Sequence, residues 1–330
     1  MNNAETTAVL KFDGTELTED KKADIVALIY IDNDEDHADD LQIITREESI
    51  SSGVHEICLT LRQDGWHGTN TNKSVNCGIF TVDDNESYFV NEMYITKAAA
   101  VTTASQIRQT PRNQAWERFN LKEVATEIAN RNGVNIIYAA ELNPIFVRKE
   151  QKNKSDIKFL SELCRGMGLR LKFTKNSLVI YNPYEYGKNE PVRTFKNGDI
   201  EIIEDRLHHK KNDTDYAQCR VMYKDPITRE LISYTYKRNK AGRRLEVRQK
   251  VSSTEEAMAL AKYSIKEKNC KEYTGHIVCD GDISLATGNI IALSGYGEYD
   301  RKYIITKALH RIQTGIYTTK IFFEMVLEGY

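Results

Sequence analysis

Residues 120–133 read Asn120-Leu121-Lys122-Glu123-Val124-Ala125-Thr126-Glu127-Ile128-Ala129-Asn130-Arg131-Asn132-Gly133, the clearest structural signal in the 330-residue chain. Asn120 can cap a helix, because its side-chain oxygen can accept from a backbone N–H one turn on, and Glu123 completes a capping box. The apolar residues of this stretch recur at helical spacing and fall on one face. The stretch therefore predicts an amphipathic helix that ends before Gly133.

A second helix and three strands follow this one. Ser155 is a suitable cap for a helix over Asp156–Met167, whose apolar residues again recur at helical spacing. The expected strands are Asn135–Tyr138, Arg170–Thr174 and Ser177–Tyr181, the last two joined by a turn at Lys175-Asn176. Together these elements predict a compact α/β module that follows a polar connector at Gln106–Trp116 and closes near Gly187.

The regions on either side of this module are rich in strand patterns. Before it, expected strands include Lys22–Ile31, Leu41–Thr45, His55–Leu61, Gly78–Val82 and Glu92–Lys97. After it come a hairpin of Ala217–Tyr223 with Leu231–Tyr236, a helix at Ser253–Asn269, and further strands that end at Thr318–Leu327. The chain is thus expected to be mainly β with an α/β insert. The predicted domains are residues 1–105, 106–190 and 191–330, and the outer two can exchange strands across these limits.

A short internal repeat links the two β regions. Tyr94-Ile95-Thr96-Lys97-Ala98 recurs as Ile304-Ile305-Thr306-Lys307-Ala308, and in both copies a glycine, Gly78 or Gly288, lies 18 residues before the threonine. Two β domains built on one plan would produce this spacing, whereas chance similarity between two ordinary hairpins is the simpler alternative. We favour duplication, because the repeat lies in the two regions that independently look β-rich.

Composition excludes several classes of protein. With 46 Lys and Arg against 48 Asp and Glu, the net charge of −2 argues against a dedicated nucleic-acid binder. No apolar run reaches the roughly 18 residues of a membrane span, so we expect no membrane insertion by this chain. The N-terminus lacks a secretory signal pattern, which predicts synthesis in the cytoplasm without export by that route. The six scattered cysteines are expected to be reduced and to fill the core.

The sequence offers no catalytic constellation. It lacks phosphate-loop, nucleophile-elbow and zinc-protease motifs, so we expect no enzyme activity, no cofactor and no metal. His208-His209 is interpreted as a solvated loop pair. The acidic run Asp32–Asp40 lacks the calcium-loop pattern and is expected to be an exposed loop. The basic run Lys237–Arg244 is interpreted as a solvated loop or as a docking loop for an acidic protein surface.

The order of these parts resembles the phage late control protein D family, the baseplate hub proteins of contractile tails. The resemblance is carried by Asp39-Asp40-Leu41-Gln42-Ile43, by Gly78-Ile79-Phe80-Thr81-Val82-Asp83, and by the closing strands. Its most specific part is the pair of helical segments, residues 120–133 and 153–168. The resemblance covers nearly the whole chain.

This resemblance implies two tail-tube-like β-barrel domains per chain, and three chains in a pseudo-sixfold ring. Such a homotrimer would join the sixfold tail tube to the threefold central spike, and it would also contact the tape-measure and baseplate wedge proteins. The particle would be a phage tail or an R-type bacteriocin, with this chain in its baseplate. The alternative functions are a tail-associated peptidoglycan hydrolase and a cell-wall-binding module.

Seven charged residues are the candidate interface residues. They are Asp34, Glu35, Asp36, Arg238, Lys240, Arg243 and Arg244. We expect charge reversal in either loop to impair particle assembly and to leave the isolated fold intact, because exposed charges steer partners without supporting a core. Particle yield together with the unfolding midpoint of the isolated variant measures both effects. A normal particle yield would contradict the assignment.

Overall fold

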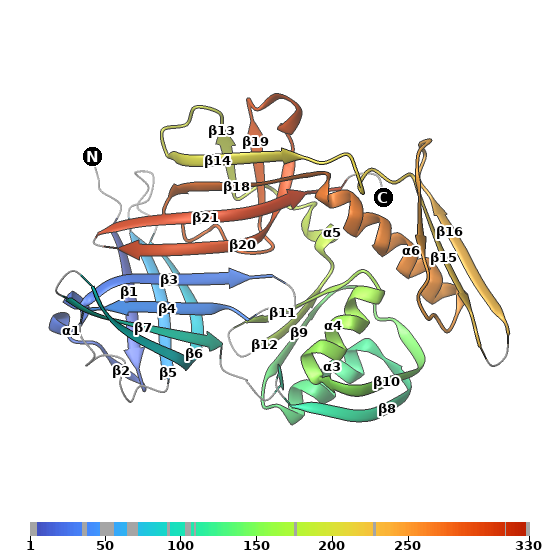
Figure 1. Ribbon diagram of the computed structural model, residues 1–330, viewed down its shortest axis with the longest axis horizontal. Helices are drawn as coiled ribbons and strands as arrows, with labels where there is room; N and C mark the ends of the chain where they lie inside the picture. The colour runs from blue at the N-terminus through green and yellow to red at the C-terminus, as the bar shows by residue number, and fades with distance from the viewer. Residues whose placement is uncertain are drawn as a thin grey trace.

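The structure is a computed structural model that describes residues 5–34, 38–46, 56–64, 72–90, 93–102, 107–108, 110–174, 177–226, 229–313 and 315–327. Strands dominate the described residues, which confirms the mainly β expectation. Figure 1 shows a large curved sheet over one half of the molecule and the α/β module with a further small sheet over the other.

The first β unit holds seven strands and one short helix around its own core. Its elements are β1 (Glu5–Phe12), β2 (Thr15–Glu16), α1 (Glu19–Ala23), β3 (Ile25–Asn33), β4 (Asp40–Thr45), β5 (Glu56–Asp64), β6 (Lys73–Val90) and β7 (Met93–Thr102). Alternation along β5 buries Ile57, Leu59 and Leu61, as its sequence pattern predicts. The expected strand at Lys22–Ile31 begins later, at Ile25. Residues 19–23 form α1 instead, with acidic side chains in its first turn and lysines in its last.

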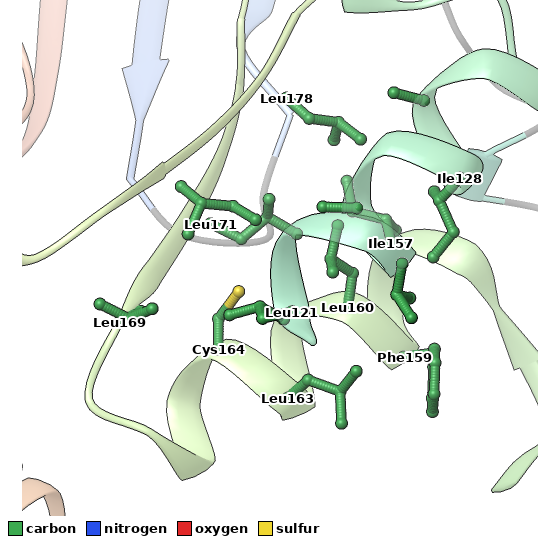
Figure 2. Close-up of a cluster of buried hydrophobic side chains, with 14 of the residues drawn as sticks. Leu121, Ile128, Ile157, Phe159, Leu160, Leu163, Cys164, Leu169, Leu171 and Leu178 are labelled. Carbon is green, nitrogen blue, oxygen red and sulfur yellow. The ribbon is translucent and has the colours of Figure 1, made fainter. Parts of the chain in front are cut away.

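The α/β module closely follows its sequence pattern. Its elements are β8 (Pro111–Asn120), α3 (Leu121–Arg131), β9 (Asn135–Ala139), β10 (Ile145–Ser155), α4 (Asp156–Gly166), β11 (Arg170–Thr174), β12 (Ser177–Tyr181) and α5 (Pro183–Tyr186). Asn120 and Glu123 form the expected capping box at α3. Ser155 is the N-cap residue of α4, although its side chain makes no cap hydrogen bond. Figure 2 shows the apolar faces of α3 and α4 packed with residues of β11 and β12.

Two strands of the module were missed by the sequence patterns. The segment interpreted as a polar connector is largely β8, which pairs antiparallel with β10. Burial alternates along β8, with Trp116 and Phe119 buried in the module core. Polar residues occupy both faces of β8, since Arg112 pairs with Asp156 and Gln114 accepts from Arg131 on the face of Trp116. The composition of the strand therefore resembles that of a loop.

The second β unit is interrupted by a smaller sheet. The unit comprises β13 (Arg193–Lys196), β14 (Ile202–His209), β18 (Tyr273–Asp280), β19 (Ile290–Ser294), β20 (Lys302–Gln313) and β21 (Ile316–Met325). Between β14 and β18, the chain forms β15 (Gln218–Lys224), β16 (Leu231–Lys237), β17 (Arg244–Val247) and α6 (Thr254–Asn269). Ser253 caps α6, and the helix packs on the three-stranded sheet around a separate core.

His208 and His209 lie in β14, so their interpretation as a loop pair is wrong. They point to opposite faces of the strand, and the ring of His209 stacks on Tyr273 with centroids 4.2 Å apart. All six cysteines are free and five of them are buried, as expected.

The internal repeat falls on one antiparallel pair of strands in each β unit, but in different registers: Thr96 lies opposite Ser87, whereas Ile305 accepts from the N–H of Gly288 itself. β6 pairs with β7 in the first unit, and β19 pairs with β20 in the second, both antiparallel. Gly288 precedes β19, but Gly78 lies inside β6 at a register shift, and both have positive φ angles of 83° and 111°. The outer neighbours differ, since β5 runs antiparallel to β6 while β13 runs parallel to β19. Duplication of a whole domain therefore stays a prediction.

Candidate assembly site at the junction of the β units

The two β units form one continuous sheet. β3 of the first unit pairs antiparallel with β20 of the second, in register from Lys307 opposite Asn33 to Gln313 opposite Ala27. This pairing produces a 13-stranded sheet with β14 and β2 at the two ends of its main strand order. Figure 1 shows β3 and β20 side by side at the centre of the sheet. The two β units are thus joined through backbone hydrogen bonds between β3 and β20.

A buried glutamine forms hydrogen bonds between the two β units at the same junction. The side-chain amide of Gln63, on β5, donates to the carbonyl oxygen of Gly281 at 2.8 Å and accepts from the N–H of Ile283 at 3.3 Å. Gln63 is fully buried, so both bonds are shielded from water. Buried polar groups are costly when unpaired, which makes this bridge specific for one arrangement of the two units.

His310, on β20, lies in the core of the junction. Its ring stacks on Tyr30 of β3, with centroids 5.8 Å apart, and its Nδ1 lies 2.7 Å from the hydroxyl of Tyr317. Burial lowers the pKa of His310 to about 4, although the nearby carboxylates of Asp32 and Asp282 act in the opposite direction. The imidazole is therefore neutral in the folded chain at neutral pH.

This histidine should make folding stability depend on pH. In the unfolded chain His310 becomes protonated below pH 6.5, whereas in the folded chain it stays neutral until about pH 4. The free energy of unfolding is therefore highest above pH 6.5 and decreases as the pH falls from 6.5 toward 4. We expect a loss of about 2 kcal/mol between pH 7 and pH 5 from this residue. In urea unfolding at these pH values, the free energy of unfolding of His310→Gln should change less with pH than that of the wild type. The control His208→Gln, at an exposed site, should keep the wild-type pH dependence. An unchanged slope in His310→Gln would refute the prediction.

Two basic residues of β11 reach from the α/β module into the junction. The first, Lys172, forms an ion pair with Asp32 at the end of β3 and also donates to the hydroxyl of Thr287. Asp32 accepts two further bonds at 2.8 Å, from the N–H and the hydroxyl of Thr287. Burial by itself would raise the pKa of Asp32, but Lys172 and Thr287 outweigh it and hold that pKa below its usual value.

The second basic residue, Arg170, bridges both β units. Its guanidinium lies 2.6 Å from Asp34 of the first unit and 2.5 Å from Glu324 on β21 of the second. The hydroxyl of Tyr181 also donates to Asp34. Burial, followed by the charge of Asp34, raises the pKa of Tyr181 well above its usual value, so this hydroxyl remains a donor. Arg170, Lys172 and their partners form what we call the junction charge cluster.

The junction charge cluster borders a cavity of about 350 Å³ between the module and both β units. Tyr30, Asp32, Lys172, Thr287 and His310 are among its lining residues. No group of three or more possible metal-ligating side chains occurs among the described residues. The arrangement thus fixes the relative orientation of three parts of the chain.

Within the part of the chain that the structure describes, no helix is long and apolar enough to cross a membrane.

Of the three acidic candidates, Asp34 lies at this junction rather than on an outer loop. Asp34 is 7% exposed and paired with Arg170, so the expectation of an exposed acidic loop is wrong for it. Asp32 and Asp39 are also buried. Glu35 and Asp36 lie outside the described residues. Asp32 and Asp34 are held inward because β11 supplies cations that the local sequence does not reveal.

The basic candidates lie together at the far end of the second unit, around the segment 211–216. Lys240 pairs with Asp215, and Arg238 donates to the carbonyl of Tyr216 at 3.3 Å. Arg243 donates to the carbonyls of Lys211 and Thr214 at 2.8 and 2.5 Å, and Arg244 pairs with Glu246 at 2.6 Å. Arg238 and Lys240 also line an open hollow of about 700 Å³. The structure does not bring these residues to Asp34.

Sequence patterns missed the residues that join the parts. Arg170 and Lys172 alternate with the buried Leu171 and Phe173, so their shared polar face was readable from β11 alone. Nothing local indicated that this face meets a strand end that carries Asp32 and Asp34. The signal that could have suggested this contact is the matching spacing of charges: two cations alternate along β11, and two carboxylates alternate at the end of β3.

Comparison with solved structures finds the same fold over nearly the whole chain. A 43 kDa tail protein of the prophage MuSo2 from Shewanella oneidensis is 12% identical, with a TM-score of 0.73, and the match covers 97% of this chain and 98% of that one. A tail protein from Neisseria meningitidis is 10% identical, also with a TM-score of 0.73, over 97% and 96% of the two chains.

A third similar structure is an Escherichia coli component of the type VI secretion system, described as structurally similar to the bacteriophage T4 tail proteins gp27 and gp5. It is 10% identical, with a TM-score of 0.61 over 97% of this chain and 78% of that one. No protein-family model and no curated protein matches this chain by sequence. The chain therefore has the fold of these tail proteins.

Proposed function

We propose that this chain is a structural baseplate hub protein of a contractile injection particle. The observation that carries the proposal is the continuous sheet, in which β3 and β20 join two β units within a fold shared with tail proteins over 97% of the chain. In the proposed particle, three copies form a pseudo-sixfold ring between the sixfold tail tube and the threefold spike. Tape-measure and baseplate wedge proteins are its further partners.

Sheet edges support this assembly. A strand at the edge of a sheet presents unpaired backbone groups, and proteins cover such edges with neighbouring chains or loops. β14 pairs on one side with β18, and β2 pairs with β1, so the two ends of the main strand order can meet other subunits. Head-to-tail contacts between copies generate a ring when the rotation closes. The basic residues Arg238, Lys240, Arg243 and Arg244 remain candidate contacts with a partner.

Electron microscopy of the purified chain, alone and mixed with tail tube and spike proteins from the same gene cluster, tests the function. We expect threefold rings with an open lumen that bind tube on one side and spike on the other. A monomer that binds neither protein would refute the proposal. A cleared band on a peptidoglycan zymogram would instead favour the hydrolase alternative, and retention on purified cell wall would favour the wall-binding one.

A further inference from the structure

An apolar groove of about 450 Å³ lies between β10 and α6, outside the junction described above. Side chains of both elements and of the segments beside them line it, among them Ile145, Val147, Met258 and Tyr263. Ile145 and Val147 are 81% and 68% exposed, which is unusual for neighbouring residues of this type on one strand. Contiguous exposed apolar surface of this kind commonly marks a contact with another protein.

Two lysines of α6 give the groove a positive end. Lys262 and Lys266 are one turn apart and both line it. Among the described residues, neither has a carboxylate within ion-pair distance; Lys266 instead lies 4.0 Å from the ring centroid of Tyr184. Burial, and then the neighbouring Lys262, lowers the pKa of Lys266. At the other end of the groove, Glu256 is already paired with Lys149. The groove therefore suits an apolar segment that carries negative charge beside the lysines.

The chain itself contains a segment with these properties. Beyond Thr81, the described part of β6 pairs with β7, and β7 pairs on its other side with β4 as far as Thr96. Among the described residues, a two-stranded ribbon therefore projects past Ser87 and Thr96. Tyr88 and Phe89 of this ribbon are 41% and 62% exposed. Residues 81–96 contain four acidic residues and no Lys or Arg, and the side chains of Asp84 and Glu86 are exposed. The nearest cation along the ribbon is Lys97 of β7, opposite Glu86.

The ribbon and the groove belong to opposite halves of the molecule. Figure 1 shows β6 and β7 near α1 at one end of the long axis, with β10 and α6 toward the other end. We propose that the β6–β7 ribbon of one copy docks in the β10–α6 groove of the next copy. Tyr88 or Phe89 fills the apolar floor, while Asp84 and Glu86 approach Lys262 and Lys266. This contact is heterologous, so repeating it builds a ring when the rotation between copies closes. The inference rests on the proposed hub function and specifies which surfaces its copies use.

Cross-linking between two variants, each with one added surface cysteine, tests this contact. Tyr88→Cys and Ala259→Cys, each made in a Cys58→Ser background, are mixed and treated with a short bismaleimide. We expect a covalent dimer in the mixture and none with either variant alone, because the contact joins two different surfaces. The five remaining cysteines are buried and should contribute little background. No dimer in the mixture, at a concentration where the chains associate, would overturn the inference.

Charge reversal provides an independent test. Lys262→Glu with Lys266→Glu should weaken self-association about tenfold or more in sedimentation velocity, since close charge pairs across an interface contribute strongly. Asp84→Lys with Glu86→Lys should restore association to that double variant. Lys268→Glu is the matched control, because this residue lies on the same helix, outside the groove, and pairs with Asp213. Unchanged association in the lysine double variant would contradict the inference.

These results separate the contact from the proposed function. Threefold rings that form normally without the cross-link would overturn the docking contact and leave the hub function intact. Cross-linked copies that assemble into open chains, and that bind neither tube nor spike protein, would support the contact and refute the hub function.

Discussion

An Arg170→Met variant should be about 3–5 kcal/mol less stable to urea unfolding than the wild type. The guanidinium is 11% exposed and lies within 2.6 Å of two buried carboxylates, Asp34 and Glu324, which belong to different β units. Removing one partner of a buried ion pair leaves uncompensated charge in a region shielded from water, and this is the costly way to break such a pair. Because the cation also holds the α/β module against the sheet, we expect that module to become sensitive to proteolysis first.

The surface arginine Arg148 is the matched control. It also contacts two carboxylates, Glu117 at 2.6 Å and Glu150 at 2.9 Å, but its side chain is 54% exposed. Arg148→Met should therefore leave the urea-unfolding midpoint nearly unchanged. Adding Asp34→Asn and Glu324→Gln to Arg170→Met should recover part of the lost stability. Equal effects of the two arginine substitutions would show that the junction charge cluster has no special role.

A Gly281→Ala variant should lose about 3 kcal/mol of stability. A Cβ at this position would lie 1.9 Å from the nearest atom of the Tyr317 ring, which the hydrogen bond to His310 holds in place. Gly281 also supplies the carbonyl that Gln63 binds across the two β units. Relieving the clash must shift the ring or the backbone, and overpacking of this kind typically costs 1–3 kcal/mol or somewhat more. Thermal or urea unfolding measures the change.

Gly166→Ala controls for the added methyl group. Gly166 is the last residue of α4, has no atom within 4 Å of an added Cβ, and does not have a positive φ. Alanine there should be neutral or stabilising by about 0.5–1 kcal/mol. Combining Gly281→Ala with Tyr317→Ala should cost less than the sum of the two single changes, because the clash disappears. Strict additivity would show that Tyr317 is not the obstacle.

Local signals in the sequence were sufficient for the capped helices and for two strands of the α/β module. The cap residues Asn120 and Ser253 begin α3 and α6, because capping depends on hydrogen bonds within a few residues. The strands β11 and β12 have the expected bounds, since both alternate clearly between turns. The strand β8 was missed because its polar composition resembles that of a loop, and the sequence does not show that it pairs with β10.

The candidate site was only partly predictable. The basic residues Arg238–Arg244 lie on a largely exposed surface segment, and nothing yet tests their proposed role in assembly. Asp34 was predicted to lie in an exposed loop, whereas the structure shows it buried. Its partner Arg170 follows it by 136 positions, a separation over which sequence pattern carries no information about contact.

The sequence by itself determined the order of parts, a β region, an α/β module and a second β region, because hydrophobic periodicity and helix caps act over a few residues. Only the tertiary structure decided that β3 pairs with β20, that Gln63 bridges the units, and that Arg170 and Lys172 meet the carboxylates of both. Pairing between distant strands and the burial of charge depend on which surfaces the folded chain brings together. These are properties of the whole molecule that no short segment contains.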